Sequence, residues 1–299
     1  MFLNVIIPSY RSKSTILDTI ESILSCHPFP GEFDITVVDS SDDDSAEVVA
    51  KSFPNVRLIK LPEQAFPGKA RNKGVENTKG DILCFIDADA AASPSWLKSI
   101  HSFFTEHPQV AAVGGPVLNA NPSEGWARLA HWCEFSGYGL KAPEGIRRVV
   151  PSVNLAIKRS AFEKYGPFLE DQFGNEDVLL LYRMYRDGAQ IHFFHNICVA
   201  HKNKTSLRKI YEHQYKLGES TGHARTLYNL PGTFLTRPGF HLLVPVIKTC
   251  LIGWRILTQE TGDFPAFLLH LPRVFWAMLS FSRGFKHGMN KARKHLEHA

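Results

Sequence analysis

The chain has 299 residues, of which 44% are hydrophobic and 21% charged, so it is long enough to bury a sizeable core. This composition excludes a disordered chain, a collagen and a disulfide-dominated scaffold. The net charge of +5 is unevenly distributed: residues 1–199 carry 19 Lys and Arg against 24 Asp and Glu, whereas residues 200–299 carry 15 against 5. An acidic N-terminal part and a strongly basic C-terminal part indicate two different functions.

Strand-like and helix-like segments alternate over the first hundred residues. Short apolar runs predict strands at 3–7, 35–38, 56–61 and 82–86. Apolar residues at helical spacing predict helices at 14–25, 45–53, 69–77 and 96–105. Uninterrupted apolar strands that alternate with helices are typical of an α/β fold with a mainly parallel sheet flanked by helices.

The pattern is less regular after residue 105. Strands are expected at 110–117, 153–157 and 191–200, and helices at 160–165 and 176–186. Residues 119–150 mix aromatic residues with Gly and Pro, which fits a loop or short helices on the substrate side.

Polar residues follow the predicted strands at three places, namely Pro8-Ser9-Tyr10, Asp39 and Asp87-Ala88-Asp89. Ligands bind at the carboxyl ends of the strands in sheets of this kind, so these residues are expected to share one site. In the Asp-x-Asp turn, one carboxylate suits a ribose and the other a hard cation on a diphosphate. An isolated Asp-x-Asp is explained equally well by a solvated turn. Asp39 supports the functional interpretation, because it is a second acidic residue at the end of a predicted strand.

The segment 66–74, FPGKARNKG, combines a glycine-bearing loop with the start of a helix. Backbone N–H groups at such a start and the guanidinium of Arg71 suit a phosphate or a base. The segment is not a Walker A motif, and no Gly-x-Gly-x-x-Gly follows the first strand. The fingerprint of a dinucleotide-dependent dehydrogenase is therefore missing.

Glu176 and Asp177 open a predicted helix. Two acids there are either a plain N-terminal cap, stabilised by the helix dipole, or include a general base that deprotonates a hydroxyl. His201 follows the last predicted strand, where an imidazole is either structural or a metal ligand.

The order of these motifs resembles that of family 2 glycosyltransferases with the GT-A fold, over roughly residues 3–215. The motifs that carry the resemblance are PSY, VVDSSDDDS, GKARNKG, DAD, NLAIKRSAF, GPF, GNED and VAH. Several short motifs in the correct order are far more specific than any one of them. A GT-A fold is a Rossmann-like, mainly parallel sheet flanked by helices.

The resemblance implies a role for each candidate residue. Asp177 would be the catalytic base and Glu176 would orient the acceptor. Asp89 and His201 would hold Mn²⁺ or Mg²⁺ on the donor diphosphate. Contact with the nucleotide-sugar would come from Pro8, Ser9, Tyr10, Asp39, Arg71, Asp87, Ala88 and Asn154.

Two departures from the family pattern refine this expectation. Arg11-Ser12 replaces the usual Asp, Glu or Asn after the first motif, and no Gln-x-x-Arg-Trp motif of processive synthases is present. The resemblance therefore implies an enzyme of the hexosyltransferase type that transfers a single sugar, with inversion, from a UDP- or GDP-linked donor to a hydroxyl acceptor. The catalytic domain would span 1–215, with a donor half to about 115 and an acceptor half from about 116, followed by a helical region at 216–299.

The apolar segments 240–254 and 264–281 are interrupted by Pro and charged residues, so neither predicts a confident membrane-spanning helix. They are either a buried helical pair or interfacial helices on an anionic membrane surface, with the basic residues at the headgroups. The second interpretation suits a lipid-linked acceptor. A nucleic-acid partner is disfavoured because the charges alternate with long aliphatic runs.

Five scattered cysteines without a Cys-x-x-Cys pair favour a reducing compartment, and the apolar run at 2–7 is too short for a signal peptide. We therefore expect a cytoplasmic protein, either free or peripheral on the cytoplasmic face of a membrane.

Two alternatives to an active glycosyltransferase stay open. A sugar-phosphate nucleotidyltransferase would carry Gly-x-Gly-x-Arg after the first strand, and an inactive GT-A module would bind without turnover.

Overall fold

The structure is a computed structural model that describes residues 1–26, 29–171 and 173–298. The chain forms two compact units. The sheet unit comprises Met1–Ala120, Pro143–Gln172 and Glu176–His201, and the helical unit comprises Asn121–Ala142, Phe173–Asn175 and Lys202–Ala299. The compact units thus divide after His201, whereas the sequence suggested a catalytic domain that runs to residue 215.

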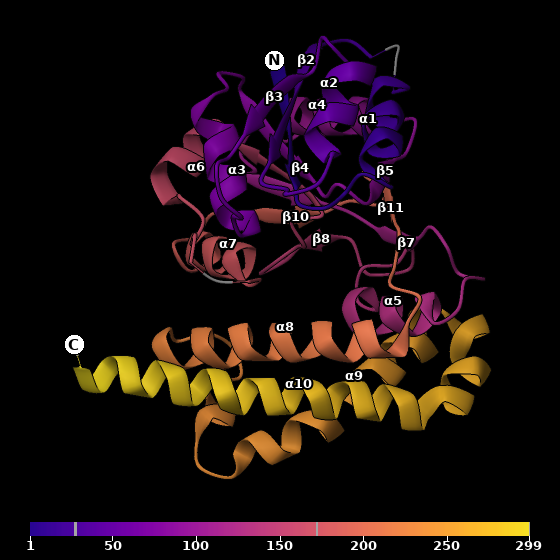
Figure 1. Cartoon of the computed structure of the whole chain (residues 1–299), viewed down its shortest axis with the longest axis vertical. Helices are drawn as coiled ribbons and strands as arrows, with labels where there is room; N and C mark the ends of the chain where they lie inside the picture. The colour runs from indigo at the N-terminus through magenta and orange to yellow at the C-terminus, as the bar shows by residue number, and fades with distance from the viewer. Residues whose placement is uncertain (27–28, 172, 299) are drawn as a thin grey trace. The chain divides into compact units, whose positions relative to one another are not determined.

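The sheet unit is built on an eight-stranded sheet with the order β3-β2-β1-β4-β9-β6-β10-β8. Figure 1 shows this sheet together with the helices that flank it. Its strands are β1 Phe2–Ser9, β2 Glu32–Asp39, β3 Arg57–Lys60, β4 Ile82–Ile86, β6 Ala112–Gly114, β8 Gly145–Ile146, β9 Asn154–Lys158 and β10 Ile191–Phe193. Strands β1 to β4 pair in parallel, whereas β9 runs antiparallel between β4 and β6. The expected α/β fold with a mainly parallel sheet is confirmed.

Helices connect these strands where the apolar spacing predicts them. They are α1 Ile16–Leu24, α2 Ser45–Ser52, α3 Pro67–Glu76, α4 Trp96–Glu106, α6 Arg159–Tyr165 and α7 Glu176–Arg186. In α1 the buried residues Ile16, Ile20 and Ile23 form the apolar stripe that faces the core. Strand β4 is buried at every residue, as expected for the centre of a sheet that is covered on both faces.

Two expected strands are each divided into two short strands. The segment 110–117 forms β6 and then β7 Val117–Asn119, because Pro116 has no N–H to donate to the first ladder. The segment 191–200 forms β10 and then β11 Val199–His201. Strand β11 pairs with β7 and with β5 Ala90–Ala92 in a separate three-stranded sheet.

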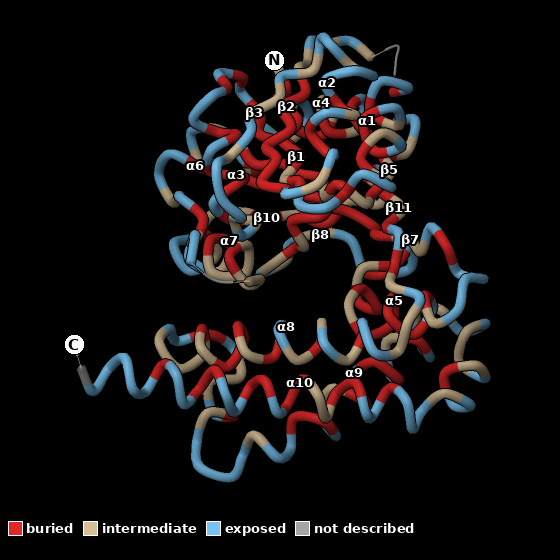
Figure 2. The backbone as a smooth tube through the Cα atoms, in the orientation of Figure 1, coloured by how far each residue is buried: buried red, intermediate tan, exposed pale blue. Residues whose placement is uncertain are grey.

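The helical unit contains α5 Ala127–Phe135, α8 Leu207–Leu227, α9 Val244–Gln259 and α10 Phe264–His298, with 3-10 turns at Thr233–Thr236, Phe240–Leu243 and Thr261–Asp263. Helix α5 lies in the region expected to be a loop or short helices. Residues of all four helices form an apolar cluster that includes Trp132, Ile210, Ile256 and Val274. Figure 2 shows that α8 and α10 each have a buried stripe along their length.

Four glycines bring the backbones of α8 and α10 into direct contact. A Cβ atom at Gly218 would lie 2.0 Å from the carbonyl oxygen of Phe281, and one at Gly222 would lie 2.0 Å from that of Phe285. Gly284 and Gly288 on α10 meet backbone oxygens of α8 in the same way. Both helices therefore carry a Gly-x-x-x-Gly stripe, which allows close helix packing that a larger residue would prevent.

The substitution Gly222→Ala tests this packing. Alanine is the better helix former by about 1 kcal/mol, but its methyl group has no space beside a backbone oxygen. We expect the free energy of unfolding to fall by about 1–3 kcal/mol, measured by chemical denaturation. In the control Gly262→Ala, the added methyl group meets no atom within 4 Å, and stability should stay nearly constant. Equal stability of the two variants would contradict the close approach.

Candidate active site

The carboxyl ends of β1 and β2 hold a buried polar cluster. Asp39 is fully buried, and its carboxylate accepts hydrogen bonds from the hydroxyl of Ser9 at 2.5 Å and from the backbone N–H and hydroxyl of Ser41 at 3.0 and 2.9 Å. The parallel pairing of Ser9 with Asp39 fixes this arrangement. The carboxylate is therefore held in one orientation at the sheet edge where ligands bind in such folds.

The residues around this cluster are more open to solvent. Pro8 is half-buried, and the ring of Tyr10 is 37% exposed. Arg11 has a left-handed backbone, with φ of 50°, and forms an ion pair with Asp42. The guanidinium of Arg11 also lies 5.3 Å from the centre of the Tyr10 ring. The position after the first motif is thus occupied by a cation that already has a carboxylate partner.

Asp89 and His201 lie side by side because β5 pairs antiparallel with β11, which sets Ala90 opposite His201. One carboxylate oxygen of Asp89 is 3.2 Å from Nε2 of His201. A carboxylate oxygen and an imidazole nitrogen form a donor set that suits Mn²⁺, and a donor diphosphate can supply further ligands. No cluster of three or more His, Cys, Asp or Glu suited to a metal occurs in the described part of the chain. The pair fits a metal that is shared with a substrate.

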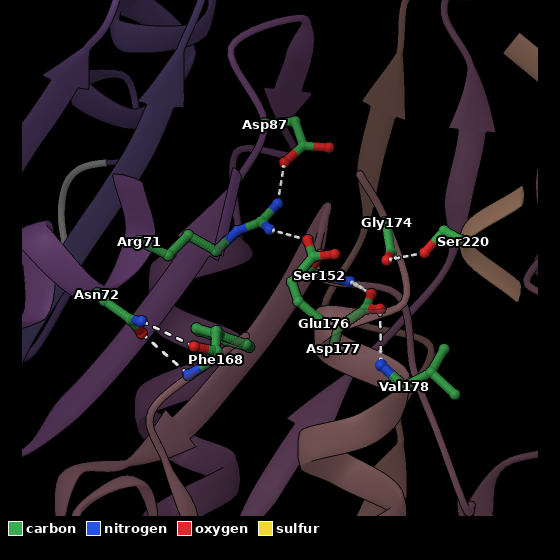
Figure 3. A network of polar contacts seen from close by, with 10 residues as sticks. All are labelled: Arg71, Asn72, Asp87, Ser152, Phe168, Gly174, Glu176, Asp177, Val178 and Ser220. Carbon is green, nitrogen blue, oxygen red and sulfur yellow. Dashed lines mark hydrogen bonds and ion pairs between the residues drawn. The ribbon is translucent and has the colours of Figure 1, made fainter. Parts of the chain in front are cut away.

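Arg71 links two carboxylates of the site (Figure 3). Its guanidinium donates to Asp87 at 2.7 Å and to Glu176 at 2.6 Å, and its side chain is 2% exposed. A planar guanidinium can serve two carboxylates at once, which an ammonium cannot do with the same geometry. The sequence suggested that Arg71 contacts the nucleotide; here both of its terminal nitrogens are directed at carboxylates.

Burial raises the pKa of Glu176 to about 7, although Arg71 acts in the opposite direction. Its Oε1 accepts the hydrogen bond from Arg71, whereas its Oε2 is buried and has no hydrogen-bond partner among the described residues. An unused acceptor beside a charged network is a place where a substrate hydroxyl can bind.

Asp177 is the next residue, and both of its oxygens accept backbone hydrogen bonds (Figure 3). Oδ2 accepts from the N–H of Ser152 at 2.8 Å and Oδ1 from that of Val178 at 2.7 Å. The preceding residues Gly174 and Asn175 are in the left-handed region, with φ of 77° and 66°, so a sharp turn starts α7. The carboxylate is therefore oriented by the backbone, as a positioned base requires.

Two other residues that are predicted to contact the nucleotide-sugar, Ala88 and Asn154, are buried. Ala88 is buried between the two aspartates. Asn154 is fully buried; it accepts a hydrogen bond from the indole N–H of Trp96 at 2.9 Å and donates to backbone oxygens of Pro116 and Ile197. These contacts already use the side-chain amide of Asn154. The role of Asn154 in donor binding stays a prediction.

Gly68 and Asn72 position the site, although neither residue has a specific role in the sequence analysis. Asn72 donates to the backbone oxygen of Phe168 at 2.9 Å and accepts from the N–H of the same residue at 3.0 Å. A Cβ at Gly68 would lie 1.9 Å from the carbonyl oxygen of Leu169. These contacts hold the first two turns of α3, which include Arg71, against the segment at 168–169.

Comparisons with known proteins identify the family and the fold. Residues 4–166 match the family described as Glycosyl transferase family 2. Glycosyltransferase AglE of Haloferax volcanii is 27% identical over 222 residues, which are 73% of this chain and 72% of that protein. The glucosyl-dolichyl phosphate glucuronosyltransferase of the same organism is 27% identical over 179 residues, or 56% of either chain.

Solved structures share the fold at lower identity. A mannosyltransferase from Pyrobaculum calidifontis, solved with GDP-Man and Mn²⁺, gives a TM-score of 0.61 at 18% identity, covering 97% of this chain and 86% of that one. Residues 1–349 of S. aureus TarS, solved with UDP-GlcNAc, give a TM-score of 0.56 at 17% identity, covering 99% and 92%. The expected GT-A fold is confirmed, and the chain, a glycosyltransferase, belongs to glycosyl transferase family 2.

Proposed function

We propose that the enzyme transfers one sugar, with inversion and with the help of a divalent metal, from a UDP- or GDP-linked donor to a hydroxyl acceptor. The observation that supports this proposal most directly is the pair of ion pairs made by Arg71. They connect Asp87, in the donor-side turn, with Glu176, which is next to the candidate base Asp177. GDP-Man in the mannosyltransferase and UDP-GlcNAc in TarS support these two donor classes.

The proposed reaction is a single displacement at the anomeric carbon. The acceptor oxygen forms a bond to that carbon, its proton passes to the Asp177 carboxylate, and the bond to the diphosphate oxygen breaks to release the nucleoside diphosphate. Glu176 would hold the acceptor hydroxyl through Oε2. Mn²⁺ or Mg²⁺, held by Asp89 and His201, would supply charge neutralisation for the leaving diphosphate.

The substitution Asp89→Ala tests the metal part of this proposal. We expect wild-type protein to bind UDP or GDP at least 10-fold more tightly with Mn²⁺ than with EDTA, because a metal held by Asp89 and His201 would neutralise the charge of the diphosphate. The variant should lose this difference in titration calorimetry, whereas Asp81→Asn, one residue before β4, should retain it. Metal-dependent binding in Asp89→Ala that equals the wild-type value would refute the assignment.

We further propose that the helical unit lies on an anionic membrane surface. The segments Phe240–Gln259 and Thr261–Glu297 are long and apolar enough to cross a membrane by length and composition alone. Many large apolar residues of these segments are exposed, and they include Leu242, Val246, Ile247, Leu251, Trp254, Leu268, Leu269 and Trp276. Exposed apolar helices with nearby basic residues are typical of interfacial binding, and a lipid-linked acceptor would follow from it.

Flotation with anionic vesicles tests the membrane proposal. Wild-type protein should float with vesicles that contain phosphatidylserine, and the fraction bound should fall with salt because basic residues contribute. A variant with L242S, W254S and L269S should bind at least 5-fold less. The control pair L24S and I146S removes exposed apolar side chains of the sheet unit and should float normally. Recovery of the wild-type protein in the soluble fraction alone would exclude the proposal.

A further inference from the structure

Two cations within the helical unit have no ion-pair partner among the residues that the structure describes. Lys248 is on α9 and Arg225 is on α8, and both are half-buried. In the part of the chain that the structure describes, no carboxylate lies within ion-pair distance of either side chain. Other basic residues of the same unit do reach one: Lys204 approaches Glu134, and Lys291 approaches Glu219.

The two cations face neighbouring rings of α10. The ammonium of Lys248 lies 3.7 Å from the centre of the Phe281 ring, and the guanidinium carbon of Arg225 lies 6.0 Å from that of Phe285. Because these rings are four residues apart on one helix, they are on the same face, one turn apart. Arg225 also donates from Nε to the backbone oxygen of Pro231 at 2.8 Å. These contacts orient the cations without neutralising them.

Burial in this position is unfavourable for the charges. It lowers the pKa of Lys248 to about 8, and the positive charges of Arg225 and Arg255 act in the same direction. Glu134 and Cys133 oppose this lowering only in part. Burial also lowers the pKa of Arg225. A bound anion would remove the unfavourable charge, and cations kept in such surroundings often mark binding sites.

The outer face of α9 indicates what kind of anion would bind. Val246, Ile247 and Leu251, on either side of Lys248 in the sequence, are 52%, 42% and 43% exposed. An anionic group held by the cations would thus have an apolar helix face next to it. Phosphate attached to an apolar chain satisfies both features, because Lys and Arg bind phosphate oxygens and the helix face binds the chain.

We propose that Lys248 and Arg225 form a binding site for the phosphate group of a lipid-linked molecule. The proposal deepens the function proposed above and rests on it in one respect, since the bound lipid would be the acceptor or its carrier. Binding itself requires neither a nucleotide-sugar nor turnover. The site can therefore be tested independently of the reaction.

Thermal unfolding of the full chain tests the site with three probes: inorganic phosphate, farnesyl phosphate and uncharged farnesol. Farnesyl phosphate at 100 times its dissociation constant should raise the Tm by about 5 °C. Lys248→Met and Arg225→Met should lose this shift. Lys248→Met without ligand should have a higher Tm than wild type, because the uncompensated charge is gone. The control Lys209→Met removes an exposed lysine of α8 and should behave like wild type.

The three probes separate the possible sources of the anion. A shift with farnesyl phosphate and with inorganic phosphate, both lost in Lys248→Met, supports a site that recognises phosphate. A shift with farnesyl phosphate alone supports the lipid source specifically. An equal shift with farnesol, a shift that survives in Lys248→Met, or no shift with either phosphate would overturn the proposal. Stabilisation by the product nucleotides UDP or GDP with Mn²⁺, measured in parallel, reports separately on the nucleotide site of the proposed reaction.

Discussion

The substitution Asp177→Asn should lower the rate constant for sugar transfer by about 10²–10⁴-fold, the contribution typical of a positioned general base. An amide cannot take the proton of the acceptor hydroxyl, so the nucleophile would stay neutral during attack. Donor binding should remain close to the wild-type value, because the donor-side groups Asp39 and Asp89 lie on other strands or turns. Single-turnover rates and nucleotide titrations on the same preparation separate the two effects.

A structural side effect of this variant must be distinguished from lost catalysis. Both oxygens of Asp177 accept backbone hydrogen bonds, so an asparagine would direct its NH₂ group at the N–H of Ser152 or Val178. Asp177→Glu keeps a carboxylate but moves it, and should recover at most a small part of the rate. Glu163→Gln, on the surface of α6, is the matched control with unchanged rate. Turnover by Asp177→Asn near the wild-type value would show that another group is the base.

The substitution Arg71→Met should lower the free energy of unfolding by about 3–5 kcal/mol, the range observed when one partner of a buried ion pair is removed. Methionine fills part of the volume but leaves Asp87 and Glu176 without their shared donor. Arg71→Lys should recover only part of the loss, because one ammonium cannot reproduce the forked geometry. Arg186→Met, at the exposed end of α7, should change stability little.

The loss of stability in Arg71→Met, measured as the free energy of unfolding, should also depend on pH. The folded pKa of Glu176 is about 7, above its ordinary value of 4.5, so its contribution to stability is present below pH 4.5 and is lost as the pH rises through 7. Without Arg71 the folded pKa rises further, and the loss continues to higher pH. The stability difference between wild type and variant should therefore be larger at pH 8.5 than at pH 6. A difference independent of pH would contradict the raised pKa of Glu176.

The sequence predicts the framework of the sheet unit well because its strands are local apolar runs. Strand β4 and helix α7 begin and end at the residues expected from their patterns. The split of the segment 110–117 was missed, although Pro116 is a visible signal for it. Strand β5 was missed because three alanines carry no strand pattern. Its pairing with β11, which sets Asp89 beside His201, is a contact between distant segments that periodicity does not report.

The contacts of Arg71 could not be predicted for a similar reason. Its partners Glu176 and Asp87 are 105 and 16 residues away, and the motif that contains it is equally compatible with a phosphate contact. The close packing of α8 on α10 did have a sequence signal, since Gly218 and Gly222 repeat at the spacing of Gly284 and Gly288. That signal requires both helices to be recognised first, and α8 has a weak apolar pattern of its own.

Release of nucleoside diphosphate from a panel of UDP-, GDP- and dTDP-sugars tests the central claim most directly. Wild-type protein with Mn²⁺ should release UDP or GDP from at least one donor in the presence of a polyprenyl phosphate-linked sugar, whose sugar hydroxyls are the acceptor groups. The release should disappear with EDTA and in Asp177→Asn and Asp89→Ala. No release from any donor together with no nucleotide binding, or equal release by wild type and both variants, would contradict the proposed metal-dependent transfer at this site.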